Sequence, residues 1–186
     1  MKSKKLLYID LETSGLSPTN NGILQIACIY EVDGEVKDTF NSYMKPPKGT
    51  VYDDAALEIN GLTKKKIKKF RKSADVFMDF RKFLDSKVDR YDKTDKMVMV
   101  AYNAHFDKSF LDAWAISCGY KYLHAYIDYR MIDILMLARV EWYRGKLNPP
   151  DFKLATVCAE YDIEISSAHN AVADILATRE LFMEML

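Results

Sequence analysis

Runs of apolar residues separated by turn-forming residues predict several short strands in the first part of the chain. Lys5 to Ile9 predicts a short buried strand, and Ile23 to Val32 predicts a second. Asp33-Gly34 is a dipeptide typical of a two-residue hairpin, so a third strand should follow through about Met44. Met97 to Ala101 is apolar throughout, which predicts a central strand that is buried on both faces.

The spacing of apolar residues becomes helical after the third strand. We expect a short helix over Asp53 to Ile59 and a longer one over Ser73 to Val88, with Ser73 as its cap. The remaining elements expected are a fifth strand near Tyr126 to Asp128 and helices over about His105 to Ser117, Met131 to Trp142, Leu154 to Tyr161 and Asn170 to the end. This order of elements predicts an α/β protein in which helices flank a mixed sheet.

The composition narrows the class of protein. A chain of 186 residues suits one domain with a single core, so residues 1–186 are expected to form one domain. The 27 basic and 27 acidic residues balance, so nucleic acid would have to be held by a local patch or by metal ions. Cys28, Cys118 and Cys158 lack the spacing of a zinc or disulfide motif, which favours the cytoplasm. The first apolar run stops at Asp10, too early for a signal peptide or membrane span, so we expect a soluble protein without a membrane partner.

The first chemical motif is the pair Asp10 and Glu12. In a strand, residues two apart point to the same face with α-carbons roughly 6.5 Å apart, so both carboxylates could reach one cation. Buried without a cation, the two charges would be strongly destabilising. The alternative is a strand end at which both meet solvent. Thr13 to Leu16 follows directly, with a glycine that would let backbone approach a ligand and with hydroxyls to present to it.

Two further motifs lie far along the chain. Asn103 and Asp107 are four residues apart and would share a face at the start of a helix, although an aspartate there is often only a capping charge. His169 and Asp174 are five apart, about 140° out of phase in a helix, so they can meet only if His169 precedes the helix in a loop. A neutral histidine in such a loop could take a proton from water, and the alternative is a plain surface histidine.

Together the motifs suggest hydrolysis of a phosphodiester with two divalent ions, Mg²⁺ or Mn²⁺, roughly 4 Å apart. The expected ligands are Asp10, Glu12 and Asp174, with Asp107 binding directly or through water. His169 would be the general base. The predicted catalytic residues are therefore Asp10, Glu12, Asp107, His169 and Asp174.

These motifs, in this order, resemble the DEDDh exonucleases, the family of the proofreading epsilon subunit of bacterial DNA polymerase III. The resemblance runs from Leu6 to about Met183 and includes H-x-A-x-x-D at His169 and N-x-x-F-D at Asn103. It implies a ribonuclease H-like fold, with a five-stranded mixed sheet flanked by helices. It also implies release of nucleoside monophosphates from 3′ ends of single-stranded or frayed DNA, with RNA as a further substrate and a DNA polymerase as a candidate partner.

The resemblance also implies where the last nucleotide would sit. Family members seat it on the segments matching Thr13 to Leu16 and Ile59 to Leu62, and Asn60 stands where a histidine is common. Leu16 and Ile59 resemble apolar wedges against the last base. Phe106 could stack on a neighbouring base or pack in the core. The predicted substrate-binding residues are Thr13, Leu16, Ile59, Asn60, Asn103 and Phe106, while Asp133 matches a position taken as structural.

The run from Lys64 to Lys72 is basic, which departs from many members of the resembling family. It suggests a phosphate-binding patch, or else a solvated helix face with Ile67 and Phe70 turned inward; both can hold together.

Three other functions fit parts of the pattern. An exoribonuclease similar to oligoribonuclease would use the same catalytic residues and differ in how it treats the 2′-hydroxyl. An aspartyl-phosphate phosphatase is disfavoured because Glu12 stands where its second aspartate belongs and no later Gly-Asp motif follows. A module that binds nucleic acid or a polymerase without cutting is disfavoured because all four acids and the histidine are present.

Overall fold

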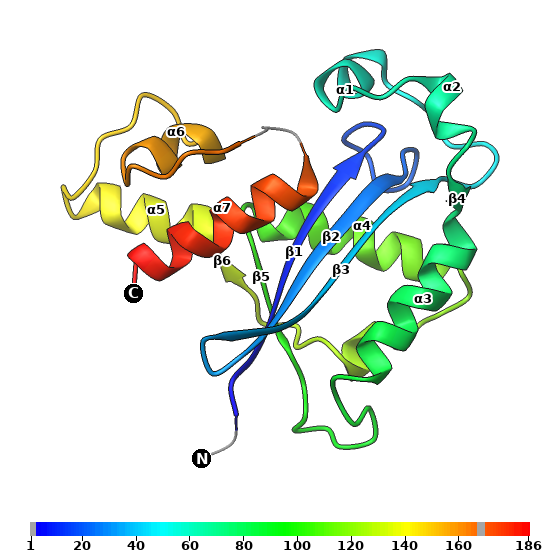
Figure 1. Ribbon diagram of the computed structural model, residues 1–186, viewed down its shortest axis with the longest axis horizontal. Helices are drawn as coiled ribbons and strands as arrows, with labels where there is room; N and C mark the ends of the chain where they lie inside the picture. Colours follow the sequence, from blue (N-terminus) through cyan, green and yellow to red (C-terminus); the bar gives the residue numbers. More distant parts are fainter. Residues whose placement is uncertain (1–2, 167–169) are drawn as a thin grey trace.

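Three long antiparallel strands form the centre of the molecule in the computed structural model, which describes residues 3–166 and 170–186 (Figure 1). They are β1 (Lys5–Thr13), β2 (Ile23–Val32) and β3 (Glu35–Lys45). The β2–β3 hairpin turns at Asp33 and Gly34, whose φ values of 51° and 87° are the left-handed ones that a two-residue hairpin requires. The predicted bounds of β2 are confirmed, and β1 is four residues longer than expected.

Three shorter strands complete a mixed sheet of order β4-β3-β2-β1-β5-β6. β5 (Val98–Ala101) is parallel to β1, and the two-residue strands β4 (Arg71–Lys72) and β6 (Ile132–Asp133) form the edges. The strand expected near Tyr126 to Asp128 is wrong. That segment makes only one bridge, between Met97 and Ile127, and the fully buried Tyr126 packs in the core, where its hydroxyl donates to Asp85 (2.6 Å).

Helices cover both faces of the sheet, as the sequence predicts (Figure 1). They are α1 (Asp54–Ile59), α2 (Lys64–Ile67), α3 (Ser73–Asp85), α4 (Ala104–Ser117), the 3-10 helix η1 (Leu123–Ala125), α5 (Ile134–Tyr143), α6 (Leu154–Ala159) and α7 (Ala171–Glu184). Leu7 and Ile9 of β1 pack in the core with α3 and α4, whereas Tyr8 packs with α5, α6 and α7 on the other face. This alternation is the two-residue period of a strand buried on both sides.

The expected serine cap of α3 is wrong. Lys72 occupies the cap position without a side-chain bond, and Ser73 is buried. The Ser73 hydroxyl oxygen instead accepts a hydrogen bond from Trp114 Nε1 of α4 (2.7 Å). The serine hydroxyl that the local sequence assigns to a helix cap therefore forms a tertiary hydrogen bond between α3 and α4 instead.

Asp133 fixes the start of α4, which confirms its expected structural role. Its carboxylate accepts hydrogen bonds from the backbone N–H groups of Asn103 (3.1 Å), Ala104 (3.1 Å) and Leu135 (3.0 Å). One side chain thus binds the orphan donors at the start of two helices, α4 and α5. The left-handed φ of 63° at Asn103 makes the sharp entry into α4.

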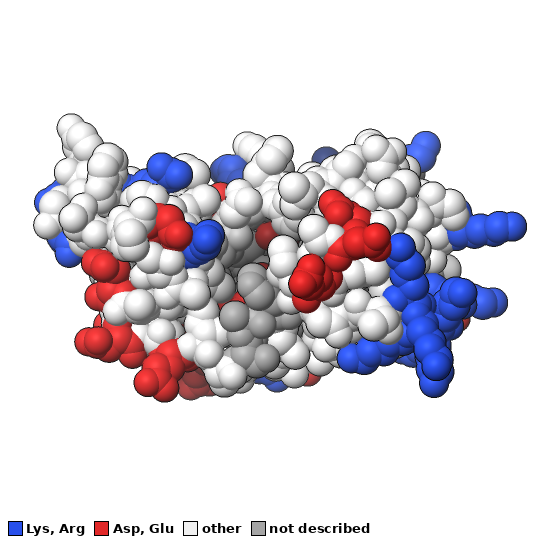
Figure 2. Space-filling model, turned by 90° about the horizontal axis from the view of Figure 1, so that it is seen from above, with Lys and Arg blue, Asp and Glu red and all other residues white. Residues whose placement is uncertain are grey.

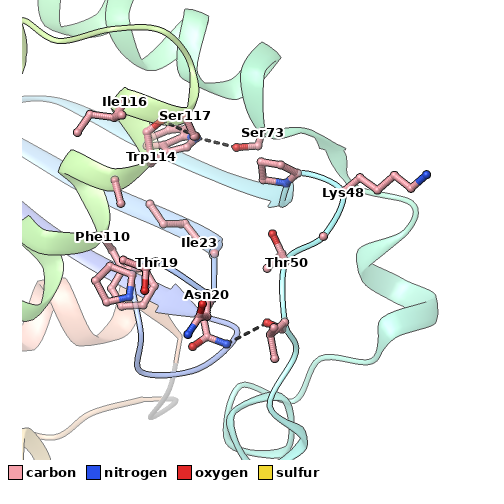
Figure 3. Close-up of a pocket in the computed structure, with 17 residues that line it drawn as sticks. Thr19, Asn20, Ile23, Lys48, Thr50, Ser73, Phe110, Trp114, Ile116 and Ser117 are labelled. Atoms are coloured by element: carbon pink, nitrogen blue, oxygen red, sulfur yellow. Dashed lines mark hydrogen bonds between the residues drawn. The ribbon is translucent and has the colours of Figure 1, made fainter.

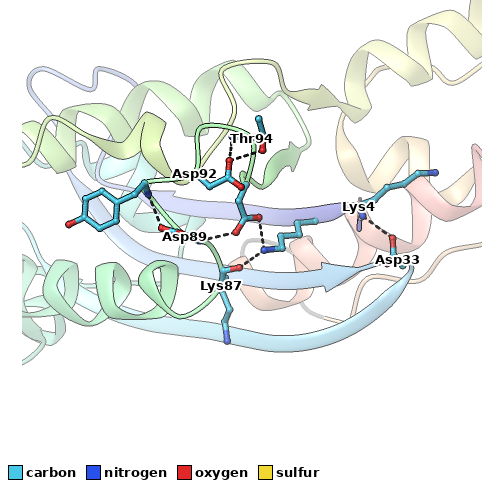
Figure 4. A network of polar contacts seen from close by, with 9 residues as sticks. Lys4, Asp33, Lys87, Asp89, Asp92 and Thr94 are labelled. Atoms are coloured by element: carbon cyan, nitrogen blue, oxygen red, sulfur yellow. Dashed lines mark hydrogen bonds and ion pairs between the residues drawn. The ribbon is translucent and has the colours of Figure 1, made fainter. Parts of the chain in front are cut away.

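Polar contacts hold the end of the sheet at which β1 begins and the β2–β3 hairpin turns (Figure 4). The Lys5 ammonium donates to the carbonyl of Lys87 (2.8 Å) and to Asp95 (2.6 Å), so the loop after α3 is held against the start of β1. The backbone N–H of Lys4 donates to Asp33 in the β2–β3 turn (2.8 Å).

A buried ion pair joins α7 to the sheet. Arg179 Nε donates to Glu31 Oε2 at 2.7 Å, and the Glu31 side chain is only 3% exposed. Arg179 also donates to the carbonyl of Gly34 (3.2 Å). These bonds set the position of α7 on β2. Across residues 3–166 and 170–186, no helix has both the length and the apolar character to span a bilayer.

Candidate active site

Two of the four predicted acids stand in the last part of β1. The strand does not end at Ile9 as expected, because its pairing with β2 continues through Asp10 opposite Ala27 and Glu12 opposite Gln25. The last residue of β1 that pairs with β5 is Tyr8, so both acids lie beyond that parallel pairing. Their two-residue spacing within a strand sets both carboxylates on one face, as predicted.

The other two acids arrive from helices that begin near this end of β1. Asp107 lies in the first turn of α4, and Asp174 lies in the first turn of α7. Asn170 caps α7, because its side chain accepts a hydrogen bond from the N–H of Val172 (3.0 Å). Both acids are therefore close to the positive ends of helix dipoles, which favours negative charge there.

The fold brings these acids together. Carboxylate oxygens of Asp10, Glu12 and Asp174 lie within 4.8 Å of one another, which is close enough to share a metal ion. Asp107 is buried beside them, and its Oδ1 accepts a hydrogen bond from the N–H of Leu11 at 3.1 Å. His169 lies outside the described residues, so its role as the base stays a prediction.

The electrostatics of this cluster are unfavourable without a cation. Burial, followed by repulsion from Asp107, Glu12 and Asp174, raises the pKa of Asp10 well above its usual range. Burial and repulsion from Asp174 raise the pKa of Glu12 to about 7. Burial also raises the pKa of Asp107, although hydrogen bonds from backbone N–H groups oppose the rise.

A divalent cation fits this donor set. In the described part of the chain, no lysine or arginine forms an ion pair with Asp10, Glu12 or Asp107. Clustered carboxylate oxygens are the ligands that Mg²⁺ and Mn²⁺ prefer, and a cation among them removes the mutual repulsion. The arrangement is therefore suited to a metal centre rather than to a structural ion pair.

The loop after β1 is organised by its own polar groups. The Thr13 hydroxyl donates to the carbonyl of Gly15 (2.7 Å), and the Ser14 hydroxyl donates to that of Val51 (2.8 Å). Both hydroxyl hydrogens are therefore used within the loop, and contact of Thr13 with a ligand stays a prediction. A Cβ on Gly15 would lie 2.5 Å from the Asn21 side chain, so packing within the loop itself requires glycine.

Asn21 is a residue that the sequence reasoning missed. Its Oδ1 accepts from the N–H of Ser17 (2.9 Å), and its Nδ2 donates to the carbonyls of Ser14 (3.2 Å) and Val51 (2.9 Å). One amide therefore closes the loop that follows Glu12. The signal available in the sequence is the turn-forming pair Asn21-Gly22.

Three of the predicted substrate residues lie around this loop. Leu16 and Ile59 are 82% and 56% exposed, so both side chains are accessible to a ligand, and their role as wedges against a base stays a prediction. Asn60 Nδ2 donates to the carbonyl of Thr13 at 2.9 Å, which ties the end of α1 to the end of β1. Asn60 thus has a positioning role, and its contact with a substrate stays a prediction.

The remaining two predicted substrate residues lie at the start of α4. Asn103 is exposed and makes no side-chain cap bond. Phe106 is half-buried, with its ring centroid 4.9 Å from that of Phe110. Core packing of Phe106 is therefore present, and its exposed part leaves stacking on a base as a prediction.

A pocket of about 640 Å³ lies apart from the acid cluster, and Figure 3 shows the side chains that line it. It opens between residues 18–23, residues 47–51 and the side of α4 that carries Trp114 and Ser117. None of the four acids lines it. Its walls carry no cluster of acid, base and nucleophile, so we assign the chemistry to the carboxylates.

Comparison with known families gives one match over most of the chain. The sequence model of the RNase T family, described as exonuclease, matches residues 7–182. The PolC-type DNA polymerase III of Bacillus subtilis is 28% identical over 191 residues, which cover 100% of this chain but 12% of the polymerase. The corresponding polymerase of Lacticaseibacillus paracasei is 29% identical over 179 residues, covering 96% and 11%. The chain thus spans about one eighth of these relatives.

Solved structures share the fold. Escherichia coli exonuclease I in complex with a dT13 oligonucleotide superposes with a TM-score of 0.78 at 22% identity, over 98% of this chain and 40% of that one. Cell-death related nuclease 4 gives a TM-score of 0.76 at 16% identity, over 98% and 63%. These similarities confirm the ribonuclease H-like class predicted from the sequence, with a sixth, two-residue strand at one edge.

Proposed function

We propose that this chain, which belongs to the exonuclease family of the DEDD 3′–5′ type, releases nucleoside monophosphates from the 3′ ends of single-stranded or frayed DNA. The observation that carries the proposal is the convergence of three carboxylates within 4.8 Å, with Asp107 bonded to the backbone between Asp10 and Glu12. DNA as the substrate is supported by relatives that are DNA polymerases and by a structural neighbour bound to dT13.

Asp10, Glu12 and Asp174 would hold two divalent ions, Mg²⁺ or Mn²⁺, with Asp107 contributing directly or through water. Such ions supply Lewis acidity and neutralise charge on a phosphodiester. The protein's own contribution is to keep four carboxylates in place despite their repulsion. The sheet holds Asp10 and Glu12, the Asp133 carboxylate fixes the start of α4, and the Glu31–Arg179 pair fixes α7.

The remaining steps fall to residues around the acids. His169, which directly precedes the α7 cap residue Asn170, would take the proton from the attacking water. The exposed side chains of Leu16 and Ile59 would hold the last base. Contacts from Thr13, Asn60, Asn103 and Phe106 would complete the seat of the 3′ nucleotide.

The test is digestion of a 5′-labelled single strand with Mg²⁺ and with a chelator. We expect stepwise shortening from the 3′ end that stops when the chelator is added. Asp10→Asn should abolish the products, whereas Asp54→Asn, which changes an exposed acid of α1, should not. No digestion with Mg²⁺ or Mn²⁺, or equal digestion by Asp10→Asn, would overturn the proposal.

Proofreading alongside a DNA polymerase is the biological setting that we propose. It is supported by the PolC-type relatives, which are polymerases many times longer than this chain. The setting predicts that a mismatched 3′ end, which frays, is digested faster than a matched one, and that RNA is digested more slowly. Equal rates on matched and mismatched ends would contradict it. The free thiols of Cys28, Cys118 and Cys158 fit a reducing compartment, and we propose the cytoplasm.

A further inference from the structure

The exposed basic patch on α2 and β4 is the strongest local concentration of positive charge in the sequence. The nine residues from Lys64 to Lys72 include seven lysines and arginines and no acid. Without these seven of the 27 basic residues, the rest of the chain carries 20 basic against 27 acidic residues. The protein is thus neutral overall only because one short segment balances an acidic remainder. A polyanion would be repelled elsewhere and attracted here.

Most of the patch is available for a ligand. Lys64 pairs with Asp54 (2.8 Å) and Arg71 pairs with Asp79 (2.6 Å). The other five lysines, which are exposed, form no ion pair with any described residue: Lys65, Lys66, Lys68, Lys69 and Lys72. Figure 2 views the molecule from above and shows basic side chains gathered at one end of it, next to a group of acidic ones. At physiological salt, charges are screened over about 8 Å, so a ligand at the patch is little affected by acidic residues on distant parts of the protein.

The apolar residues of the run, Ile67 and Phe70, pack against the rest of the protein. Ile67 is 1% exposed and packs in a small core with Leu24, Leu57 and Leu62. Phe70 packs on Tyr43 with ring centroids 5.1 Å apart. The inward orientation expected for Ile67 and Phe70 is therefore confirmed. It leaves the run without an exposed apolar face, which an amphipathic membrane-binding segment needs, so the patch is suited to phosphates rather than to a bilayer.

The patch is also tied to the acid cluster. Asn60 donates to the carbonyl of Thr13 (2.9 Å), and the N–H of Asp53 donates to that of Ser14 (2.8 Å), so both ends of α1 are bonded to the residues after Glu12. Lys64 follows Asn60 by four residues, which can span at most about 14 Å. The lysines therefore begin within a few nucleotides' length of the proposed cleavage site.

We propose that this patch binds the backbone phosphates of the DNA strand upstream of the nucleotide being removed. The proposal rests on the exonuclease function proposed above, because it assigns the 3′ end of the same strand to the acid cluster. As contacts we assign Lys65, Lys68 and Lys69, three of the five exposed lysines that form no ion pair with a described residue. Contact with phosphates carries no sequence preference, which suits an enzyme that removes any nucleotide.

The test compares Lys65→Gln/Lys68→Gln/Lys69→Gln with a control, Lys82→Gln/Lys93→Gln/Lys121→Gln. The control removes the same charge from exposed lysines elsewhere on the full chain. Binding of a long fluorescent oligothymidine is measured with a chelator present, at several salt concentrations. For single strands each contact contributes about 0.7 to the slope of log affinity against log salt, so the patch variant should lose about 2. Between about 50 and 200 mM salt both proteins should lose affinity. The factor by which the patch variant loses affinity should be roughly 20 times smaller than the factor for the unchanged protein.

Turnover provides a second, independent readout. The patch variant should have a raised KM on the long strand and an unchanged kcat/KM on a thymidine dinucleotide, which is too short to reach the patch. Replacing the same three lysines by arginine should restore the salt slope. Circular dichroism checks that both triple variants fold.

The outcomes separate the two proposals. If the unchanged protein binds the long strand through the patch but digests nothing, the exonuclease function fails and the patch stands. Equal salt slopes for the patch variant and the control would overturn the patch. So would an equal loss on the dinucleotide, or patch-dependent binding to phosphatidylserine vesicles and not to the strand.

Discussion

The buried ion pair between Glu31 and Arg179 gives a sharp test of how α7 is held on the sheet. Arg179→Met keeps the apolar stem but leaves the Glu31 carboxylate without its cation. Glu31 is 3% exposed, so water cannot replace the hydrogen bond and charge that Arg179 supplies. Breaking a buried pair from one side costs roughly 3–5 kcal/mol. Because the Arg179 side chain is 25% exposed and water reaches it, we expect the lower end, about 3 kcal/mol.

The assay is urea unfolding followed by far-ultraviolet circular dichroism. A loss of about 3 kcal/mol is a large part of a typical total of about 5–15 kcal/mol, so the midpoint should fall clearly with an unchanged slope. Glu31→Gln/Arg179→Met removes both charges, and its loss should be smaller than the sum of the two single losses by at least about 1 kcal/mol. A loss below about 1 kcal/mol for Arg179→Met, or additive single losses, would refute the reasoning.

Three further predictions concern the acid cluster and its loop. With Mg²⁺ at about 100 times its dissociation constant, the unchanged protein should gain about 2.7 kcal/mol in urea unfolding, and Asp10→Asn should gain far less; an equal gain would contradict the ligand assignment. Without divalent ions, the folded pKa of Glu12 at about 7, above its ordinary 4.5, makes the folded state bind more protons than the unfolded one. Stability should therefore fall by about 3 kcal/mol as pH rises from 4.5 to 7, and Glu12→Gln should remove this part of the pH profile measured by unfolding at each pH. Gly15→Ala should cost about 2 kcal/mol, because its Cβ would lie 2.5 Å from Asn21, and a thermal midpoint within error of the unchanged protein would argue against this packing.

Several elements could be predicted from the sequence because their causes are local. Ile23–Val32 was predicted with the bounds that the structure has, since a long apolar run ends at the hairpin pair Asp33-Gly34. The helical spacing predicts a helix over Asp53 to Ile59, and the structure has α1 over Asp54–Ile59 with Asp53 as its cap, which accepts from the N–H of Ala55 (3.2 Å). The inward side of the basic run followed from the spacing of Ile67 and Phe70.

Other features were settled by contacts between distant segments. The segment from Tyr126 to Asp128 forms one bridge, to Met97, instead of a strand. The hydroxyl of Ser73 accepts from Trp114 instead of capping α3. The apolar run from Lys5 to Ile9 predicts a strand that ends before Asp10 and Glu12, because the apolar pattern stops at the first carboxylate. Pairing with β2 carries the strand past them all the same.

For the candidate site, the sequence by itself determined the chemistry: which carboxylates occur, their spacing within each motif, and the histidine that would serve as base. Only the tertiary structure decided that Asp10, Glu12 and Asp174 share one place, because that depends on where α7 docks on the sheet. The physical reason is that backbone preferences act over a few residues, whereas bringing like charges together costs free energy. The packing of the whole chain must offset that cost until a cation does.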